Sequence, residues 1–295
     1  MKVGVLGLGL MGTALANSLL SKKHEVHVYN RTQEKTLVLV EKGATGHSSP
    51  AELGRAVEVA VTFVSDHAAV EEVTMGEKGL LRGLREGSLW VDMSTIDPDA
   101  SKRHAEESVR RGIERLDIPV VASPQMMAEG RGIFLAGGPK GVFEKYQPFL
   151  ASLASQVLYF GESGSGHRMK LVMNLYLALM SLSFSEALAF SQGLGFDPSA
   201  FVETVNKTAH KNYLSEVKGV KMAKGDFEPS FSLKMMLKDV LLADGQAKLH
   251  KIVLPLSSLA TQIYTMASNL GQGEMDYSSV VLLVQTMNAM KPLEK

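Results

Sequence analysis

The stretch Met1-Lys2-Val3-Gly4-Val5-Leu6-Gly7-Leu8-Gly9-Leu10-Met11-Gly12 decides the fold. A short apolar run leads into three closely spaced glycines, and a helical pattern follows up to Ser21. Such glycines suit a tight turn, close backbone approach to a pyrophosphate, and close packing of a helix on a strand. Unpaired N–H groups at the start of the helix favour an anion. The pattern predicts a nucleotide site that comprises Gly7, Leu8, Gly9, Leu10, Met11 and Gly12.

The end of the second predicted strand, Glu25–Tyr29, indicates which dinucleotide binds. A site for NAD usually has Asp or Glu there, whose carboxylate accepts a hydrogen bond from the ribose 2′-hydroxyl. Here the chain reads Asn30-Arg31-Thr32, and no acid occurs before Glu34. Arg31 offers a fork of donors that fits a phosphate, and its two neighbours add neutral donors. We therefore expect NADP(H) to be preferred over NAD(H).

Composition excludes several classes of protein. The chain of 295 residues has 31 Lys and Arg against 31 Asp and Glu, and no basic stripe suggests a nucleic-acid partner. It has no cysteine, which excludes disulfides, thiol nucleophiles and zinc–thiolate sites. The histidines show no ligand-like spacing, so we predict no metal. The N-terminal apolar run is short and interrupted by glycines, and we expect a cytoplasmic protein with no membrane partner.

The first half of the chain alternates predicted strands and helices, which is typical of a doubly wound, mainly parallel α/β sheet of the Rossmann type. Beyond the glycine-rich segment 161–166 the strand signals largely stop, and a long helical pattern runs over His167–Leu194. We therefore expect a dinucleotide-binding domain over 1–162 and an all-α domain over 163–295. The predicted strands are Lys2–Leu6, Glu25–Tyr29, Val57–Val64, Ser88–Asp92, Arg115–Val121, Ile133–Ala136 and Gln156–Phe160, and further helices are predicted over Ser199–His210, Leu233–Leu249, Pro255–Leu270 and Ser278–Met290.

The start of the long helix holds a candidate acid–base group. A hydride-transferring site still has to move a proton to or from the substrate oxygen. Lys170 and Asn174 are four residues apart, so their side chains meet on one helix face, which is more apolar than the face with Arg168. A partly desolvated lysine has a lowered pKa and is useful near neutrality. Read from the residues alone, a lysine at such a position is more often a surface residue that extends its amine to solvent.

Several motifs together resemble the β-hydroxyacid dehydrogenase family, which includes 3-hydroxyisobutyrate dehydrogenase and glyoxylate/succinic semialdehyde reductase. The similarity covers essentially the whole chain. The matching stretches are residues 7–12, Asn30-Arg31-Thr32, Asp92-Met93-Ser94-Thr95, Gly164-Ser165-Gly166 with Lys170 and Asn174, Leu237-Lys238-Asp239, and Gly271-Gln272-Gly273-Glu274-Met275-Asp276-Tyr277-Ser278. The resemblance implies that Lys170 is the catalytic acid–base and that Asn174 acts beside it. It also implies cofactor contacts at Val64, Ser65, Thr95 and Lys238, and substrate contacts at Ser94.

One stretch departs from the family pattern. Where the family usually has Ser-Gly-Gly to hold a substrate carboxylate, this chain has Val121-Ala122-Ser123, followed by Pro124. Side chains at glycine positions restrict positive φ, and proline has no N–H to donate. We expect these three residues to line a substrate pocket that offers fewer donors to a carboxylate and more surface to a carbon chain, with Ser123 as a replacement donor.

The leading interpretation is an NADP-dependent oxidoreductase that acts on a small aldehyde, a semialdehyde or a 3-hydroxy acid. The alternatives are an imine reductase and a catalytically idle NADP-binding scaffold, which tend to lack the lysine, and a short 6-phosphogluconate dehydrogenase, for which no phosphate-binding cluster is evident. Because the long helix is apolar on more than one side, we also expect a homodimer or homotetramer joined through residues beyond 162.

Overall fold

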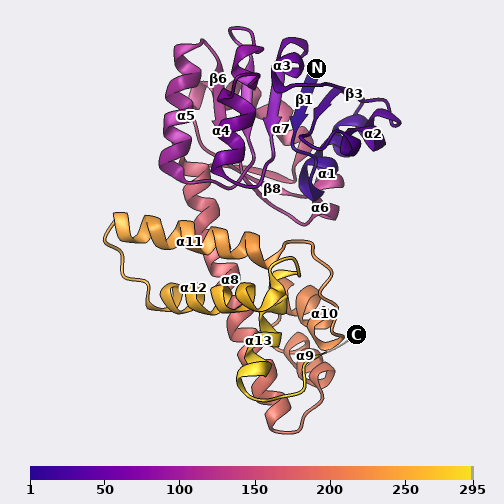
Figure 1. The fold of residues 1–295 in the computed structure, drawn as a ribbon, viewed down its shortest axis with the longest axis vertical. Coiled ribbons are helices and arrows are strands. Elements are labelled where there is room, and N and C mark those ends of the chain that lie inside the picture. The colour runs from indigo at the N-terminus through magenta and orange to yellow at the C-terminus, as the bar shows by residue number, and fades with distance from the viewer. Residues whose placement is uncertain (294–295) are drawn as a thin grey trace. The chain divides into compact units, whose positions relative to one another are not determined.

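The glycine-rich turn joins the first strand of a parallel sheet to the first helix in the computed structural model, which describes residues 1–293 (Figure 1). By its internal contacts the chain divides into two units, Met1–Lys170 and Leu171–Lys295. The division falls within one long helix, α8 (Ser165–Gly193).

Within the described residues, the first unit contains a six-stranded sheet in the order β3-β2-β1-β4-β5-β6. All five pairings in it are parallel. The order reverses at β1 and β4, which makes the carboxyl ends of these two strands the switch point where such folds bind their ligands. The strands are β1 (Lys2–Leu6), β2 (Glu25–Tyr29), β3 (Thr45–Gly46), β4 (Val59–Thr62), β5 (Leu89–Asp92) and β6 (Glu114–Asp117).

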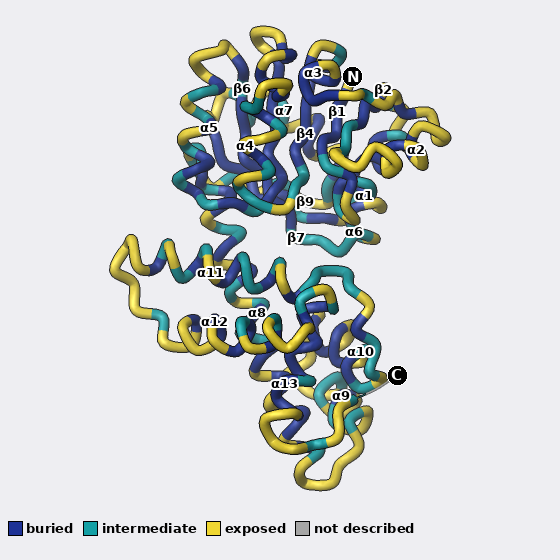
Figure 2. The backbone as a smooth tube through the Cα atoms, viewed as in Figure 1, coloured by how far each residue is buried: buried dark blue, intermediate teal, exposed yellow. Residues whose placement is uncertain are grey.

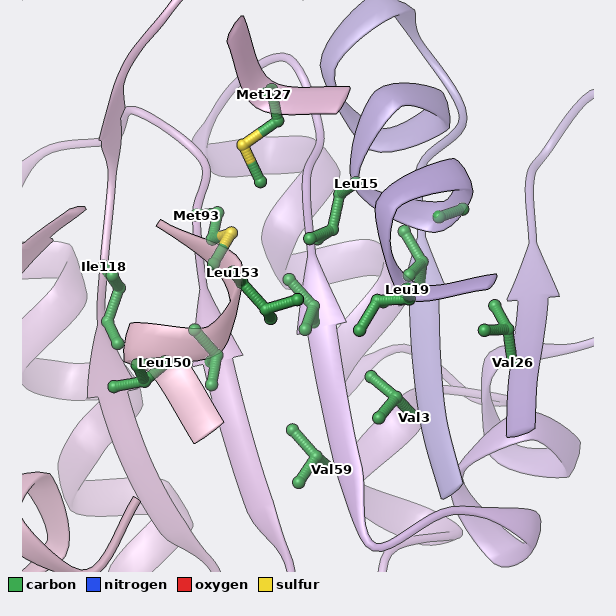
Figure 3. Packing of buried hydrophobic residues seen from close by; sticks show 14 of the residues in the cluster. Val3, Leu15, Leu19, Val26, Val59, Met93, Ile118, Met127, Leu150 and Leu153 are labelled. Atoms are coloured by element: carbon green, nitrogen blue, oxygen red, sulfur yellow. The ribbon is translucent and has the colours of Figure 1, made fainter. Parts of the chain in front are cut away.

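Helices cover both faces of this sheet, as apolar runs in the strands require. Val59 and Val61 of β4 pack on one face with α1, α6 and α7, whereas Ala60 packs on the other face with α3 and α4. Figure 3 shows Leu15 and Leu19 of α1 lying over the strand residues of the first face. The helices of this unit are α1 (Leu10–Ser21), α2 (Glu34–Val40), α3 (Pro50–Ala56), α4 (His67–Met75), α5 (Pro98–Arg110), α6 (Pro124–Ala128) and α7 (Lys140–Leu153).

A second, smaller sheet follows β6 and consists of β7 (Val120–Val121), β8 (Ile133–Ala136) and β9 (Gln156–Tyr159). The strand predicted over Arg115–Val121 is therefore wrong as a single element. Its first half pairs with β5 and its second half pairs antiparallel with β8. Pro119 lies between the halves, and because proline has no N–H, it cannot continue a ladder.

The described part of the second unit is helical, which confirms the predicted α/β plus all-α fold class. Ala178, Leu182 and Leu188 of α8 lie in its core with residues of α11 and α12, and Figure 2 shows the alternation of buried and exposed residues along these helices. By length and composition alone α8 is apolar enough to cross a membrane, as core helices often are. The other helices are α9 (Pro198–Lys207), α10 (Val220–Ala223), α11 (Leu233–Leu249), α12 (Pro255–Ala267) and α13 (Val280–Met287).

Candidate active site

The three glycines of the first turn occupy three different environments. Gly7 has a φ of +96°, which a residue with a side chain rarely adopts. A Cβ on Gly12 would overlap the carbonyl oxygen of Gly7, so this glycine lets α1 pack against the turn. A Cβ on Gly9 would meet nothing within 4 Å. No described side chain caps the N-terminus of α1, so its first N–H groups face the open space beside Gly9. The turn can therefore hold an anionic group against these N–H groups.

The side chain of Asn30 connects this turn to the end of β2 through hydrogen bonds. Its Oδ1 accepts a hydrogen bond from the Leu8 N–H (2.9 Å), and its Nδ2 donates to the carbonyl oxygen of Thr32 (2.9 Å). Gly7 also donates its N–H to the carbonyl oxygen of Tyr29 (3.0 Å). Asn30 therefore holds the shape of the nucleotide turn, a role that its position after a strand did not reveal.

Arg31 and Thr32 lie at the surface beyond β2. They follow Asn30 directly, so the loop that the amide of Asn30 braces also carries the guanidinium. No acidic residue lies between the end of β2 at Tyr29 and Glu34, the first residue of α2. This end of β2 thus presents a positive group where an adenosine ribose lies in folds of this type.

The ends of β4 and β5 are joined by buried polar contacts. The Val64 N–H donates to Oγ of Ser94 (3.1 Å), and the Ser94 N–H donates to Oδ1 of Asp92 (3.1 Å). Ser94 is 1% exposed, so its hydroxyl positions the loop of Val64 and Ser65. The predicted substrate contact of Ser94 and the cofactor contacts of Val64, Ser65 and Thr95 stay predictions.

Asp92 is also one partner of an ion pair inside the sheet. Its Oδ2 lies 3.1 Å from Nη2 of Arg115, and both side chains are buried. The guanidinium of Arg115 lies 4.5 Å from the ring centre of Trp90, whose indole N–H donates to Thr62 (2.9 Å). The Asp-x-Ser-Thr motif therefore begins with a structural residue of β5 whose carboxylate contacts Thr62 of β4 and Arg115 of β6.

The start of α8 is held by Asp117, the last residue of β6. Its Oδ1 accepts from the Gly164 N–H (2.8 Å) and its Oδ2 from the His167 N–H (3.2 Å). His167 is fully buried and donates from Nε2 to the carbonyl oxygen of Ser94 (2.9 Å). Burial lowers the pKa of His167, although the carboxylates of Asp117 and Asp92 oppose this effect. These contacts fix the first turn of the helix that carries Lys170.

Lys170 and Asn174 lie one turn apart on α8, as their spacing predicts. Lys170 is half-buried and takes part in a polar interaction. Asn174 is 4% exposed, and its Nδ2 donates to Oδ2 of Asp239 on α11 at 2.5 Å. Lys238 lies beside this pair, with its Nζ 3.1 Å from Oδ1 of Asp239. The sequence motif includes Asp239, but no role was predicted for this residue. Its position directly after Lys238, a predicted cofactor contact, was the one indication that it lies near the site.

The altered loop is the start of a helix. Val121 ends β7, and Ser123 is the N-cap of α6, where its Oγ accepts from the Met126 N–H (3.2 Å). Pro124 occupies the first helical turn, where a missing N–H costs nothing. Ala122 packs against the buried core of the first unit. The pair Ser-Pro is a common helix start, and this signal was present in the sequence.

The first unit thus brings together residues 7–12, Asn30, Val64, Ser65, Ser94 and Thr95 at the carboxyl edge of its parallel sheet. In the second unit Asn174 and Lys238 meet at Asp239. The chemistry that the first unit supports is the binding of a dinucleotide at the carboxyl edge of its sheet. The helix α8 carries the amine of Lys170 and, one turn later, the amide of Asn174.

Two family models match the chain in succession. The NAD-binding domain of 6-phosphogluconate dehydrogenase matches residues 2–161. The NAD-binding domain of NADP-dependent 3-hydroxyisobutyrate dehydrogenase matches residues 164–284.

Named relatives are similar over nearly the whole chain. Glyoxylate/succinic semialdehyde reductase 2 of Arabidopsis thaliana is 34% identical over 95% of this chain and 78% of its own length. Glyoxylate/succinic semialdehyde reductase 1 of the same plant is 33% identical over 97% of this chain and 99% of its own length. The crystal structure of 3-hydroxyisobutyrate dehydrogenase from Salmonella typhimurium has a TM-score of 0.89 at 26% identity, and the match covers 96% of this chain and 99% of that one.

Proposed function

The chain belongs to the NAD(P)-dependent hydroxyacid dehydrogenases that act on CH–OH groups, the β-hydroxyacid dehydrogenase family, and on that premise we propose that it interconverts a small aldehyde or semialdehyde and its alcohol with NADP(H). The observation that carries the proposal is that the chain has two features together. One is a glycine turn held by Asn30, and the other is the amine of Lys170, which lies one helical turn before Asn174 on α8. Semialdehydes are named for two relatives, and a 3-hydroxy acid is named for the solved structure from Salmonella typhimurium.

The choice of NADP(H) over NAD(H) rests on the end of β2. Arg31 is exposed there and can donate two parallel hydrogen bonds to a 2′-phosphate. Asn30 supports this choice indirectly, because its hydrogen bonds to Leu8 and Thr32 hold the loop that carries Arg31. A carboxylate at this place would repel the phosphate, and the nearest acid, Glu34, begins α2.

When bound, the nicotinamide supplies or accepts the hydride, and the protein has to manage the proton. In the reductive direction Lys170 donates a proton to the carbonyl oxygen as that oxygen becomes a hydroxyl; in the oxidative direction it removes that proton. Asn174 presents its amide on the same helix face, held by Asp239. Asp117 and His167 position the helix and do not need to touch the substrate.

We propose that Val121, Ala122 and Ser123 contribute to substrate selection, and that Ser94 also contacts the substrate. Because the hydroxyl of Ser123 already caps α6, its remaining capacity is to donate one hydrogen bond. Fewer donors for a carboxylate favour substrates with a larger apolar part. The physiological substrate is thus a short aldehyde or semialdehyde that is not selected by its carboxylate alone.

The helical unit supports a proposed homodimer or homotetramer joined through residues beyond 162. A groove of about 410 Å³ is lined by Phe190, Leu194 and Phe196 with neighbouring apolar residues, and these three side chains are exposed. Exposed apolar groups at this density are typical of a contact surface. Light scattering on the full chain tests this; a mass of one chain at micromolar concentration contradicts it.

Steady-state turnover tests the function. The full chain is assayed against aldehydes, semialdehydes and 3-hydroxy acids with both cofactors, next to Lys170→Ala and the control Arg168→Ala, which removes an exposed charge from the same helix. Lys170→Ala should lower kcat by about two to four orders of magnitude while cofactor affinity is kept. An imine reductase or a catalytically idle scaffold would show no turnover of aldehydes. If Lys170→Ala keeps more than about a tenth of the wild-type kcat, Lys170 is not the group that transfers the proton.

A further inference from the structure

Three side chains of the first unit, from the helices α4 and α5, converge on one another. His67 is the first residue of α4, Glu71 lies one turn later on the same helix, and His104 lies on α5. Nε2 of His67 is 3.2 Å from Oε1 of Glu71, and Nε2 of His104 is 3.9 Å from the same oxygen. One potential ligand atom from each residue lies within 4.8 Å of the other two.

His104 is an unusual residue to bury at this place. It is 1% exposed, and neither ring nitrogen has a hydrogen-bond partner among the residues that the structure describes. A buried polar group without a partner destabilises the folded state, because it loses its hydrogen bonds to water. Its ring packs against Trp90 (5.9 Å between ring centres) and against His67 (5.5 Å), contacts that a phenylalanine could make without the cost. The nitrogens are therefore the feature of His104 that packing does not account for.

We propose that His67, Glu71 and His104 form a binding site for a divalent transition-metal ion of the zinc class. Two imidazoles and one carboxylate are a common three-ligand set for this ion, which leaves a fourth position for water. Glu71 and His67 reach solvent, so an ion has a path of entry. The site does not rest on the proposed enzymatic function, and sequence spacing could not reveal it, because His67 and His104 come from different helices.

The three ligand atoms lie within 4.8 Å of one another and have to approach the spacing of a tetrahedral site. With metal–ligand bonds of about 2.0–2.1 Å, ligand atoms in a tetrahedral site stand about 3.3 Å apart. The pair of His67 and Glu71 is already at 3.2 Å, and the pair of His104 and Glu71 has to close from 3.9 Å. The planes of the two histidine rings are inclined by only 15°. The half-buried ring of His67 therefore has to turn before both lone pairs can point at one ion. His104 stays fixed by burial.

The surrounding charges permit a cation. A metal binds an imidazole through a ring-nitrogen lone pair, and both ring nitrogens of His104 lack a hydrogen-bond partner among the described residues. Arg115 is the charged neighbour that opposes a cation, and its guanidinium is neutralised by Asp92 at 3.1 Å. Nδ1 of His104 has no acceptor among the described residues, and a missing outer partner weakens a metal site by about 10- to 100-fold. We therefore expect a site weaker than a structural zinc centre.

The site would link the first turn of α4 to the middle of α5. Asp66 caps α4 by accepting from the Ala69 N–H (2.9 Å), and the loop before it carries Val64 and Ser65. An ion that bridges the two helices stabilises the folded state in proportion to its concentration above the dissociation constant. A rise in Tm with added metal is therefore a second readout, independent of activity.

The test is calorimetric titration of the untagged, chelator-stripped full chain with Zn²⁺, repeated with Co²⁺ and visible absorption to report the ligand geometry. A single saturable site is expected. His67→Gln and Glu71→Gln, both at the surface, should each weaken binding by at least about tenfold, the lower limit for losing even an outer partner. The controls are His250→Gln, an exposed histidine elsewhere, and His47→Gln, whose ring nitrogen is already bonded to His27 (2.8 Å). Both controls should keep the wild-type affinity.

His104→Phe gives the sharpest outcome. It keeps an aromatic ring against Trp90 and removes the unpartnered nitrogens, so its metal-free form should be at least as stable as the wild type, with no rise in Tm on adding Zn²⁺. Absence of saturable binding overturns the proposal. So does wild-type affinity in both His67→Gln and Glu71→Gln, or an equal loss of binding in His47→Gln.

Discussion

The amide of Asn174 donates a 2.5 Å hydrogen bond to the carboxylate of Asp239, and both side chains are almost fully buried. Asp239→Ala leaves this amide without its partner, which should lower the free energy of unfolding by about 1–3 kcal/mol. Asp239→Asn keeps an acceptor oxygen and should cost less. Urea unfolding of both variants checks the order, and equal losses would contradict a role for this hydrogen bond.

Arg31 should determine the preference for NADPH. Arg31→Ala removes a charge-assisted contact worth about 1.5–3 kcal/mol, which corresponds to roughly ten- to a hundredfold in affinity for NADPH and leaves NADH almost unchanged. Lys35→Ala, which removes another exposed positive charge nearby, is the matched control. The measurement is kcat/KM with each cofactor. A wild-type protein that uses NADH equally well would refute the assignment.

The loop of Val121, Ala122 and Ser123 should set the relative rates of substrates with and without a carboxylate. Changing all three to Ser, Gly and Gly should shift the ratio of kcat/KM by about 1–3 kcal/mol toward short 3-hydroxy acids or semialdehydes. Ser123→Ala alone should instead reduce stability by about 0.5–2 kcal/mol, because it removes the N-cap of α6. An unchanged ratio in the triple variant would show that this loop does not select substrate.

Stability should fall as the solution is acidified below about pH 6.5, the ordinary pKa of histidine. The pKa of His167 is lowered in the folded protein by burial, so in this range the unfolded chain binds a proton that the folded protein excludes. Each such histidine contributes a slope of at most about 1.4 kcal/mol per pH unit. His167→Gln, which can still donate to Ser94, should flatten the dependence between pH 6.5 and pH 5 in chemical unfolding. An identical slope would exclude this residue as a cause.

Lys218 and Asp276 form a buried ion pair in the helical unit, with 2.6 Å between Nζ and Oδ2. Burial lowers the pKa of Lys218, and Asp276 opposes this shift. Asp276→Asn removes the counter-charge and should destabilise the protein by about 3–5 kcal/mol. Adding Lys218→Met should recover part of the loss, because no uncompensated charge then remains. A double-mutant cycle measures the coupling, and simple additivity would contradict it.

The sequence was sufficient for features that depend on local pattern. Apolar strands, the three glycines and the long helix each have a signature within a few neighbouring residues, and they predicted the parallel sheet and the helical second half. Asp239 and Asn174 are 65 residues apart in the chain, and Asp117 and Gly164 are 47 apart. Contacts of this kind depend on how elements pack, which periodicity does not encode. The strand predicted across Pro119 was wrong because its apolar run continues although its hydrogen-bond partner changes from β5 to β8.

Asp117 bears on how mutational scans of this protein are to be interpreted. It is completely buried, pairs with Gly137 through its backbone, and caps the helix of Lys170 with both carboxylate oxygens. A screen that scores only growth or product will rank Asp117 with the proton-transferring residue, although solvent does not reach its side chain. Measuring the amount of soluble protein distinguishes the two effects. Substitutions at Asp117 should reduce the amount of soluble protein, whereas Lys170→Ala should leave that amount unchanged and lower only the turnover rate.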